Sequence, residues 1–251
     1  MALKTRLIPI ILFSDYKAVK TIQFANPRNV GSPVSNVKIY SRQKVDELIF
    51  LDINAYKENR GPFFEIVEDV IEESFMPLTI GGGIQNLNDI ERLLKLGADK
   101  VSINTYSVKP DLIKDSANAF GSQCIVVSVD VKKNSDGRYE VYVGCGKKGT
   151  GQSPVSFCKR MQDSGAGEIL FTSIDHEGLM KGYDLQLIRL VAEAVTIPVI
   201  ANGGAGNSQH FVDAVVEGDA SAVAASSLFH FTDQSPVAAR IYMREKGLNV
   251  R

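Results

Sequence analysis

The amino-acid sequence repeats itself once, at a constant shift of 121 residues. The aligned pairs are 46–53 (DELIFLDI) with 167–174 (GEILFTSI), 76–86 (MPLTIGGGIQN) with 197–207 (IPVIANGGAGN), and 93–105 (LLKLGADKVSINT) with 214–226 (AVVEGDASAVAAS). Pro77 falls on Pro198 and Gly97 on Gly218, and the central glycine pairs are also in register. Because residues that restrict or free the backbone coincide at one shift, chance similarity is a poor explanation. We therefore expect one structural half that occurs twice.

Short β-rich segments alternate with longer segments of helical periodicity along the whole chain. The expected strands are 6–12, 47–53, 77–81, 99–104, 124–131, 167–173, 198–202 and 221–225. Segments such as IVVSVDV are apolar on both faces, which is typical of parallel strands covered on both sides. Eight strand–helix units in 251 residues predict an α/β fold, a single-domain (β/α)8 TIM barrel whose duplicated half-barrels span about 1–121 and 122–251. A doubly wound sheet is the alternative.

The composition argues against several classes of protein. The net charge is −1, so no overall basic field favours nucleic-acid binding. The three cysteines lack CxxC spacing and the three histidines are scattered, so we expect neither a metal site nor a disulfide framework. There is no run of about eighteen apolar residues, and no signal-peptide cleavage site follows the apolar start. We expect a cytoplasmic protein with no cofactor and no membrane or nucleic-acid partner.

Each half carries a glycine pair directly after a strand, Gly82-Gly83 in the first and Gly203-Gly204 in the second. Glycine lets the backbone approach a ligand closely and leaves N–H groups available to an anion. These turns fall at the carboxyl ends of strands, where the active sites of TIM barrels lie. The fourth and eighth strands end in Asn104-Thr105 and Ala225-Ser226, positions at which barrels frequently bind phosphate. Two symmetry-related sites predict a small ligand with a phosphate at each end.

Several motifs resemble one family over essentially the whole chain. They are FLDI (50–53), GGGI (81–84), GADKVSINT (97–105), FGSQ (120–123), GAGEIL (165–170), GYD (182–184), IANGGAG (200–206) and FHF (229–231). In these segments the chain is similar to the HisF family, the cyclase subunits of imidazole glycerol phosphate synthase, a lyase of histidine biosynthesis. The resemblance implies ammonia and a bisphosphorylated ribulosyl aminoimidazole carboxamide as reactants. It also implies a HisH-like glutaminase subunit, which docks at the N-terminal face as a heterodimer and feeds ammonia through the barrel.

The resemblance implies a pair of opposed catalytic aspartates, a general acid and a general base, at the ends of strands 1 and 5. It assigns the strand-5 role to Asp130 in VSVDV. The strand-1 segment, IPCLDVKDG-like in the family, reads IPIILFSDY here and puts Leu12 at the catalytic position. Asp15 lies three residues further on and is not expected to occupy that position. Because a hydrocarbon side chain cannot transfer a proton, we expect cyclase activity to be reduced or lost.

Other residues match the family's active-site face, and one loop departs from it. The matching residues are Lys20, Asp52 and Asn104. Lys20 is suited to pair with an anionic substrate. After strand 6 the family's DRDGT reads DHEGL, so Glu177 replaces an aspartate before Gly178, and Leu179 replaces a threonine. We expect these changes to weaken or reshape the second-half phosphate site, while the first-half site stays whole.

Charged residues at the opposite end of the barrel also match the family, which closes its ammonia entrance with four of them. Carried over residue by residue, this ammonia gate consists of Arg6, Glu47, Lys100 and Glu168. A single charge at the start of a strand is most often merely solvated. Here all four have the expected type, and the two glutamates are related by the shift of 121 residues. Alternating charges can neutralise each other in a partly buried ring. The resemblance also assigns Asp99 to the glutaminase interface.

The two ends of the expected barrel indicate different outcomes. The complete gate favours ammonia delivery, whereas Leu12 opposes full cyclase activity. We expect a HisF-like subunit whose physiological role is to channel ammonia to an acetamidino-sugar amidotransferase. Second-copy HisF-like proteins of lipopolysaccharide biosynthesis share the apolar strand-1 segment and resemble this chain at Val19-Lys20-Thr21. The alternative is a fully active histidine-biosynthesis cyclase. A weaker alternative is a HisA-like sugar-phosphate isomerase, which has no need of the gate.

Overall fold

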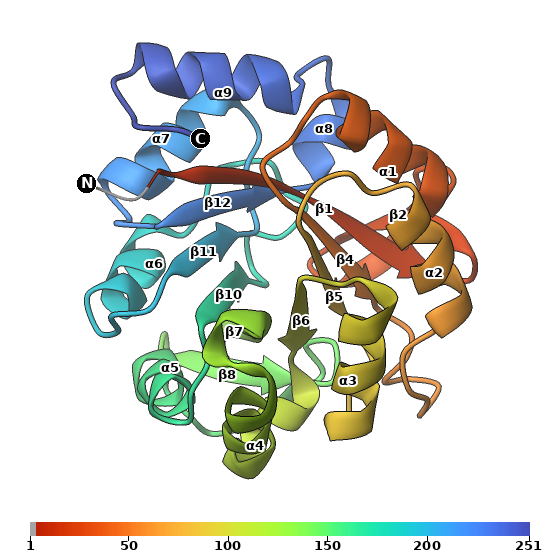
Figure 1. The fold of residues 1–251 in the computed structure, drawn as a ribbon. Helices are drawn as coiled ribbons and strands as arrows, with labels where there is room; N and C mark the ends of the chain where they lie inside the picture. Colours follow the sequence, from red (N-terminus) through yellow and green to blue (C-terminus); the bar gives the residue numbers. More distant parts are fainter. Residues whose placement is uncertain (1–3) are drawn as a thin grey trace.

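Eight parallel strands close into a barrel in the computed structural model, which describes residues 4–251 apart from the side chains at positions 106 and 110 (Figure 1). The barrel strands are β1 (Arg6–Ser14), β4 (Leu48–Asp52), β5 (Leu78–Gly81), β6 (Lys100–Ile103), β7 (Ile125–Lys133), β10 (Glu168–Ser173), β11 (Val199–Asn202) and β12 (Ala222–Ala225). β12 pairs with β1 and β10 pairs with β7, so the ring of strands has no open edge. The predicted TIM barrel is confirmed, and the doubly wound alternative is wrong.

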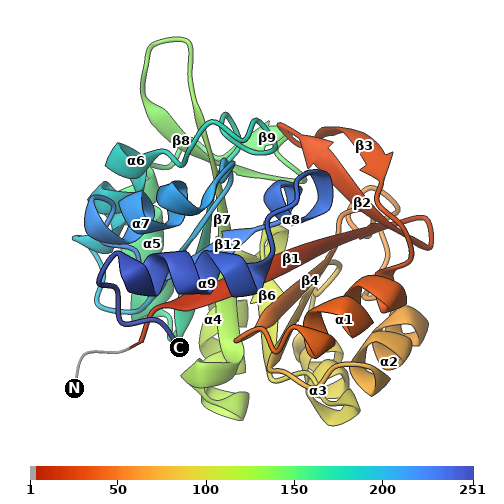
Figure 2. The same cartoon turned by 90° about the horizontal axis from the view of Figure 1, so that it is seen from above.

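Helices surround the strands and form the outer layer (Figures 1 and 2). They are α1 (Pro33–Arg42), α2 (Phe64–Glu72), α3 (Leu87–Leu96), α4 (Pro110–Phe120), α5 (Pro154–Asp163), α6 (Leu185–Ala192), α7 (Ser208–Val216), α8 (Ser227–Phe231) and α9 (Pro236–Glu245), with short 3-10 turns at Thr105–Val108 and Ser122–Cys124. Several begin at a side-chain cap. Asn86 and Asn207, for example, each accept a hydrogen bond from the backbone N–H three residues further on. These two caps are related by the shift of 121 residues.

The apolar core has an outer layer, between strands and helices, and an inner layer inside the barrel. The inner layer consists of Ile8, Ile10, Ile49, Val126, Leu170, Ile200, Ala222 and Ala224, with Leu12 and Leu51 packed against it. The eight residues from Ile8 to Ala224 in this list are each at most 2% exposed. This layer fills the barrel and separates its two mouths. Within residues 4–251, no helix is long and apolar enough to cross a membrane.

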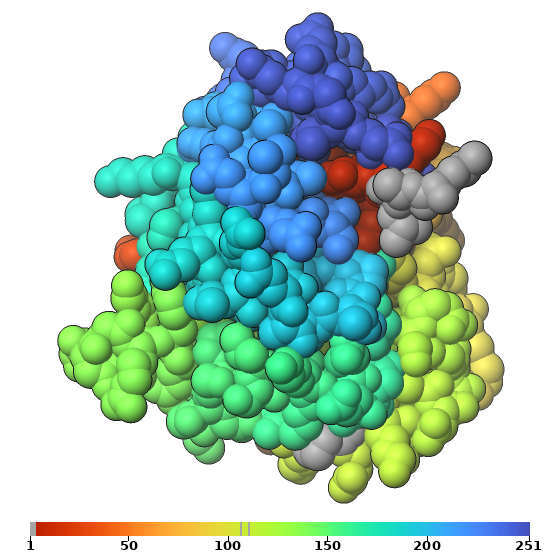
Figure 3. Space-filling view, turned by 90° about the vertical axis from the view of Figure 1, so that its left-hand side faces the viewer, coloured from red at the N-terminus to blue at the C-terminus, as the bar shows by residue number. Residues whose placement is uncertain are grey.

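Two hairpins rise from the carboxyl end of the barrel and were not predicted. One consists of β2 (Lys17–Ile22) and β3 (Ala25–Asn29), and the other extends β7 through β8 (Tyr139–Val143) and β9 (Lys148–Gly149). Figure 2 shows both at the same end of the molecule, and in the side view of Figure 3 the green β7–β8 hairpin projects at the left. β3 has the sequence ANPRN and is exposed throughout, so it lacks the apolar alternation that reveals a strand.

Candidate active site

A single pocket at the carboxyl ends of the strands collects the residues expected to bind substrate. Those that line it are Leu12, Lys20, Asp52, Gly82, Gly83, Asn104, Thr105, Asp130, Glu177, Gly178, Gly203, Gly204, Ala225 and Ser226. They lie together because each one ends a parallel strand or belongs to the loop that follows it. Their roles in binding and catalysis stay predictions, but their common location is a property of the fold.

Asp130 lies on β7 and its carboxylate is almost fully buried. Asn104 Nδ2 donates to Asp130 Oδ2 at 3.0 Å, and the hydroxyl of Thr172 also donates to this carboxylate. Asn202 Nδ2 in turn donates to Thr172 Oγ1 at 3.0 Å. Burial raises the pKa of Asp130 to about 7, although both hydrogen bonds act in the opposite direction. A carboxyl group with a pKa near neutrality is suited to both accept and donate a proton.

Leu12 lies on β1 and lines the pocket. It pairs with Leu51 of β4 and packs with it against the inner apolar layer. Asp15 lies outside the pocket lining, in the exposed turn after β1, where it accepts hydrogen bonds from Ser14 Oγ and Asn54 Nδ2. The strand-1 wall of the pocket is therefore hydrocarbon at this position, as expected from the sequence.

Asp52 is engaged within its own loop. Its Oδ1 accepts the backbone N–H groups of Asn54 and Ala55, and its Oδ2 pairs with Arg60 Nη1 at 2.6 Å. Arg60, Tyr56 and Lys57 of the same loop also line the pocket, and none of the three was predicted from the sequence. A cationic residue in a long polar loop gives no periodic signal, so only the fold reveals that it faces the site.

The two glycine pairs make turns that no other residue fits. Gly82 has φ +105°, and a Cβ added to it would lie 2.3 Å from the carbonyl oxygen of Asp52. Gly204 has φ +120°, and its Cβ would lie 2.1 Å from the carbonyl oxygen of Gly182. Both turns thus pack directly on neighbouring backbone, and the shift of 121 residues pairs Gly82 with Gly203 and Gly83 with Gly204.

Two hydroxyl groups at the end of β12 are available to a ligand. Ser226 and Ser227 line the pocket and are at most 7% exposed, and their Oγ atoms have no hydrogen-bond partner among the described residues. Buried hydroxyl groups are normally paired, so these atoms are suited to an oxygen-rich ligand. Ser227 was not predicted, because the expected phosphate position at the end of the eighth strand comprised only Ala225 and Ser226.

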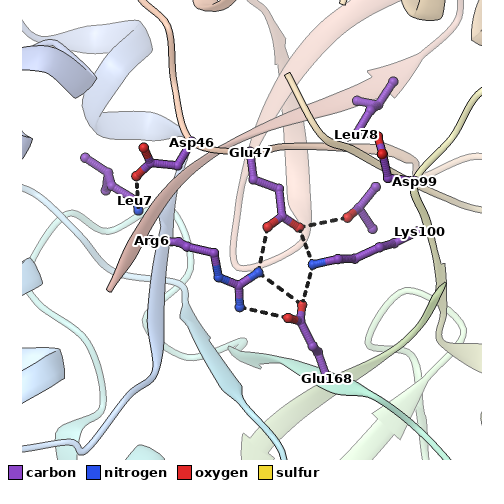
Figure 4. Close-up of polar contacts among 9 residues, drawn as sticks. Arg6, Leu7, Asp46, Glu47, Leu78, Asp99, Lys100 and Glu168 are labelled. Atoms are coloured by element: carbon purple, nitrogen blue, oxygen red, sulfur yellow. Dashed lines mark hydrogen bonds and ion pairs between the residues drawn. The ribbon is translucent and has the colours of Figure 1, made fainter. Parts of the chain in front are cut away.

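At the opposite mouth, the four gate residues form a closed ring (Figure 4). Arg6 Nη1 lies 2.6 Å from Glu47 Oε2, and Arg6 Nη2 lies 2.9 Å from Glu168 Oε1. Lys100 Nζ lies 3.0 Å from a carboxylate oxygen of each glutamate. Each cation therefore contacts both anions. Burial alone would raise the pKa of Glu47, but the charges of Arg6 and Lys100 lower it overall.

Asp99 lies next to the ring on the same face and is exposed. Its Oδ2 accepts the backbone N–H of Leu78 at 2.8 Å. Asp46, which was not predicted, has a similar place beside Glu47: it accepts the backbone N–H of Leu7 and pairs with Arg240. The N-terminal face thus combines a neutralised ring with carboxylates around it.

The residues at both mouths of the barrel lie within the segments that match known proteins. A family model described as "Histidine biosynthesis protein" matches residues 6–234. The chain is 46% identical over 250 residues to the imidazole glycerol phosphate synthase subunit HisF of Hydrogenobaculum sp. (strain Y04AAS1), and the alignment covers 99% of each protein. Both matches include the strands that carry the gate and the pocket.

Proposed function

Since this chain belongs to the HisF family of histidine biosynthesis proteins, we propose that it acts as the barrel subunit of a glutamine-dependent imidazole glycerol phosphate synthase. The observation that carries the proposal is the arrangement along one axis. A neutralised charged ring closes one mouth, and a buried carboxyl group with a pKa near 7 lies in the pocket at the other. Ammonia released by a HisH-like glutaminase at the N-terminal face enters at Arg6, Glu47, Lys100 and Glu168, beside Asp99.

In this function the pocket holds the bisphosphorylated ribulosyl aminoimidazole carboxamide. Gly82, Gly83, Asn104 and Thr105 bind one phosphate, and the second-half turns with Ser226 bind the other. Asp130 accepts and returns protons as ammonia adds to the substrate and the ring closes, since its pKa allows both states near neutral pH. The reaction needs no resident cofactor, and the proposed location is the cytoplasm.

We infer that Leu12 occupies the place of a second acid–base group. Among the described residues, the other carboxylates that line the pocket are Asp52 and Glu177, and each is held in an ion pair. Losing one general acid or base typically lowers a rate by about 10²–10⁴-fold. We therefore expect a slow cyclase whose proton transfers depend on Asp130.

Leu12 is also the observation that favours a second candidate, the delivery of ammonia to an acetamidino-sugar amidotransferase without cyclisation. This was our first expectation from the sequence. The identity to the Hydrogenobaculum HisF subunit supports the first proposal better, because that protein's name refers to imidazole glycerol phosphate synthase and to no sugar acceptor. A HisA-like isomerase is disfavoured by the gate, for which an isomerase has no use.

The test supplies ammonium salt and the bisphosphorylated substrate to the purified chain and measures formation of imidazole glycerol phosphate. We expect slow turnover that Asp130→Asn abolishes and that Leu12→Asp raises by about 10²-fold or more. An inactive chain that Leu12→Asp makes active favours the ammonia-delivery candidate. If both the chain and Leu12→Asp are inactive with correctly folded protein, the cyclase function is wrong.

A further inference from the structure

The carboxylate of Glu177, in the loop after β10, contacts three residues of the β2–β3 hairpin. Its Oε1 forms an ion pair with Lys20 Nζ and accepts Thr21 Oγ1 at 3.1 Å. Its Oε2 accepts the backbone N–H of Phe24 at 3.0 Å. Glu177, Lys20 and Thr21 are each at most 4% exposed. A single buried carboxylate thus connects the hairpin to the opposite side of the pocket.

The backbone around Glu177 reinforces this connection. Gln23 N–H donates to the carbonyl oxygen of Glu177 at 2.9 Å, and Gln23 Nε2 donates to the carbonyl oxygen of Asp175 at 2.9 Å. Gly178 packs so tightly that a Cβ there would lie 2.4 Å from the carbonyl oxygen of Thr21. The outer strand β3 is exposed throughout. β2 also pairs with β1 at the base of the hairpin, through Val19 and Leu12, whereas the contacts with Glu177 hold the hairpin nearer its tip.

The tip of the hairpin needs external support. Gln23 and Phe24 form a two-residue turn between the paired residues Ile22 and Ala25, with φ values of +50° and +62°. Turns with two left-handed residues strongly prefer glycine or asparagine, and neither residue is present at these positions. The N–H groups of both turn residues donate to Glu177, one to its backbone and one to its side chain. Glu177 therefore stabilises a turn that the local sequence disfavours.

The same carboxylate is the counter-charge of Lys20. Two other ionisable groups also lie near Lys20: Arg28 on β3, which is positive, and His230 on α8, whose pKa is lowered to about 4 by burial and by Lys20. Burial lowers the pKa of Lys20 to about 7, and the charge of Arg28 adds to this effect. The adjacent Glu177 carboxylate favours the charged ammonium instead. Within the described residues, Glu177 is the carboxylate that forms an ion pair with Lys20.

We propose that Glu177 is a positioning residue that fastens the β2–β3 hairpin over the pocket and holds Lys20 there as a charged group for the anionic end of the ligand. Lys20 follows Val19, the strand partner of Leu12, so it lies on the wall that lacks a carboxylate. The proposal rests on the proposed function only for the identity of the ligand. It adds a residue that acts through Lys20 and needs no contact with substrate.

The first test measures amide hydrogen exchange in residues 17–29 of the full chain. We expect Glu177→Gln to accelerate exchange at Phe24 and its neighbours by more than tenfold. Asp175→Asn is the matched control, because that carboxylate lies two residues away and accepts the backbone N–H of Lys133 on the other hairpin. The control should leave exchange in residues 17–29 within twofold of the unmodified chain. Equal exchange in Glu177→Gln and the unmodified chain would overturn the proposal.

The second test separates positioning from simple structural support. Lysines are labelled by reductive methylation with ¹³C-formaldehyde, and Lys20, assigned with Lys20→Arg, is titrated by NMR. Glu177→Gln should move its titration to lower pH by more than one unit. Glu177→Asp keeps the negative charge and should shift the titration of Lys20 by less. This variant also provides a test if Glu177→Gln does not fold. An unchanged Lys20 titration together with faster exchange means that Glu177 supports the hairpin alone, and the positioning role is wrong.

Turnover measurements connect this role to the pocket. In Glu177→Gln the KM for the bisphosphorylated substrate should rise more than tenfold at pH 8 and less at pH 6, where a larger fraction of Lys20 carries its proton. A KM increase that is the same at both pH values contradicts the proposal. If the unmodified chain shows no turnover at all, the proposed function fails, while the exchange and titration results still decide the role of Glu177.

Discussion

The charged ring at the N-terminal mouth allows a quantitative prediction, because each of its members has two partners of opposite charge. Replacing Glu47 with Gln removes the anion that lies 2.6 Å from Arg6 and 3.0 Å from Lys100. Glu168 is then left to neutralise both cations, and the ring changes from neutral to a net charge of +1. Glu47 is only 2% exposed, so water cannot replace it. Removing one partner of a buried ion pair costs about 3–5 kcal/mol, and we expect about 3 kcal/mol here, since both cations keep one partner.

A double-mutant cycle tests this reasoning. Lys100→Met alone leaves two glutamates with Arg6 and should also destabilise the fold. In the Glu47→Gln/Lys100→Met protein the ring is neutral again, as Arg6 with Glu168. The double variant should therefore lose less than the sum of the single changes, by about 2 kcal/mol.

The assay is equilibrium urea unfolding followed by circular dichroism at pH 7.5, with m-values compared between variants. Repetition at high salt should alter the coupling little, because buried pairs are weakly screened. Additive single effects, or a cost below about 0.5 kcal/mol for Glu47→Gln, would refute the view that the ring is a coupled, buried unit. In that case the four charges are solvated individually.

Two further predictions concern the pocket. Asp130→Asn should stabilise the protein at alkaline pH, because the pKa of Asp130 in the folded state is raised to about 7. Below about pH 4 this carboxyl group does not lower the free energy of unfolding. Its destabilising effect grows as pH rises toward 7 and is constant above it, on the order of 4 kcal/mol. Unfolding at pH 4 and pH 8 checks this, and an equal effect at both pH values would contradict the raised pKa. Gly204→Ala should destabilise the fold by more than about 2 kcal/mol, since its Cβ would meet the backbone of Gly182 at 2.1 Å and its φ is +120°. A melting temperature within a degree of the unmodified protein would show that the turn can relax.

The sequence predicted the barrel because its strands are marked by residues with strong backbone preferences. Pro77 and Pro198, followed by glycine pairs at equal distances, located the same strand in both halves, and every barrel strand lies within two residues of its expected bounds. The same logic located the pocket, because strand ends in a parallel barrel meet at one mouth. The glycine turns followed from position after a strand, whereas Leu12 and Asp130 followed from the resemblance to the HisF family.

Contacts between loops were beyond this logic. The pair formed by Lys20 and Glu177 joins residues 157 positions apart through a hairpin whose second strand, ANPRN, has no strand-like pattern. The hairpin turn at Gln23 and Phe24 carries no glycine, so no turn signal was present. Arg60 was equally hidden, because its role depends on which way a polar loop folds back onto Asp52.

In the proposed function, the apolar layer between the two mouths determines which form of nitrogen travels along the barrel. An ammonium ion moving past Ile10, Ile49, Leu170 and Ile200 would be stripped of its hydration shell, which costs several kcal/mol for any ion in such surroundings. Ammonia has no charge to desolvate and gives up only hydrogen bonds. In the proposed function, therefore, the proton stays on the glutaminase side, and each nitrogen reaches the substrate as a free base, already in its nucleophilic state. In this function the hydrocarbon side chains of the inner layer, rather than a catalytic group, keep the ammonia unprotonated on its way to the substrate.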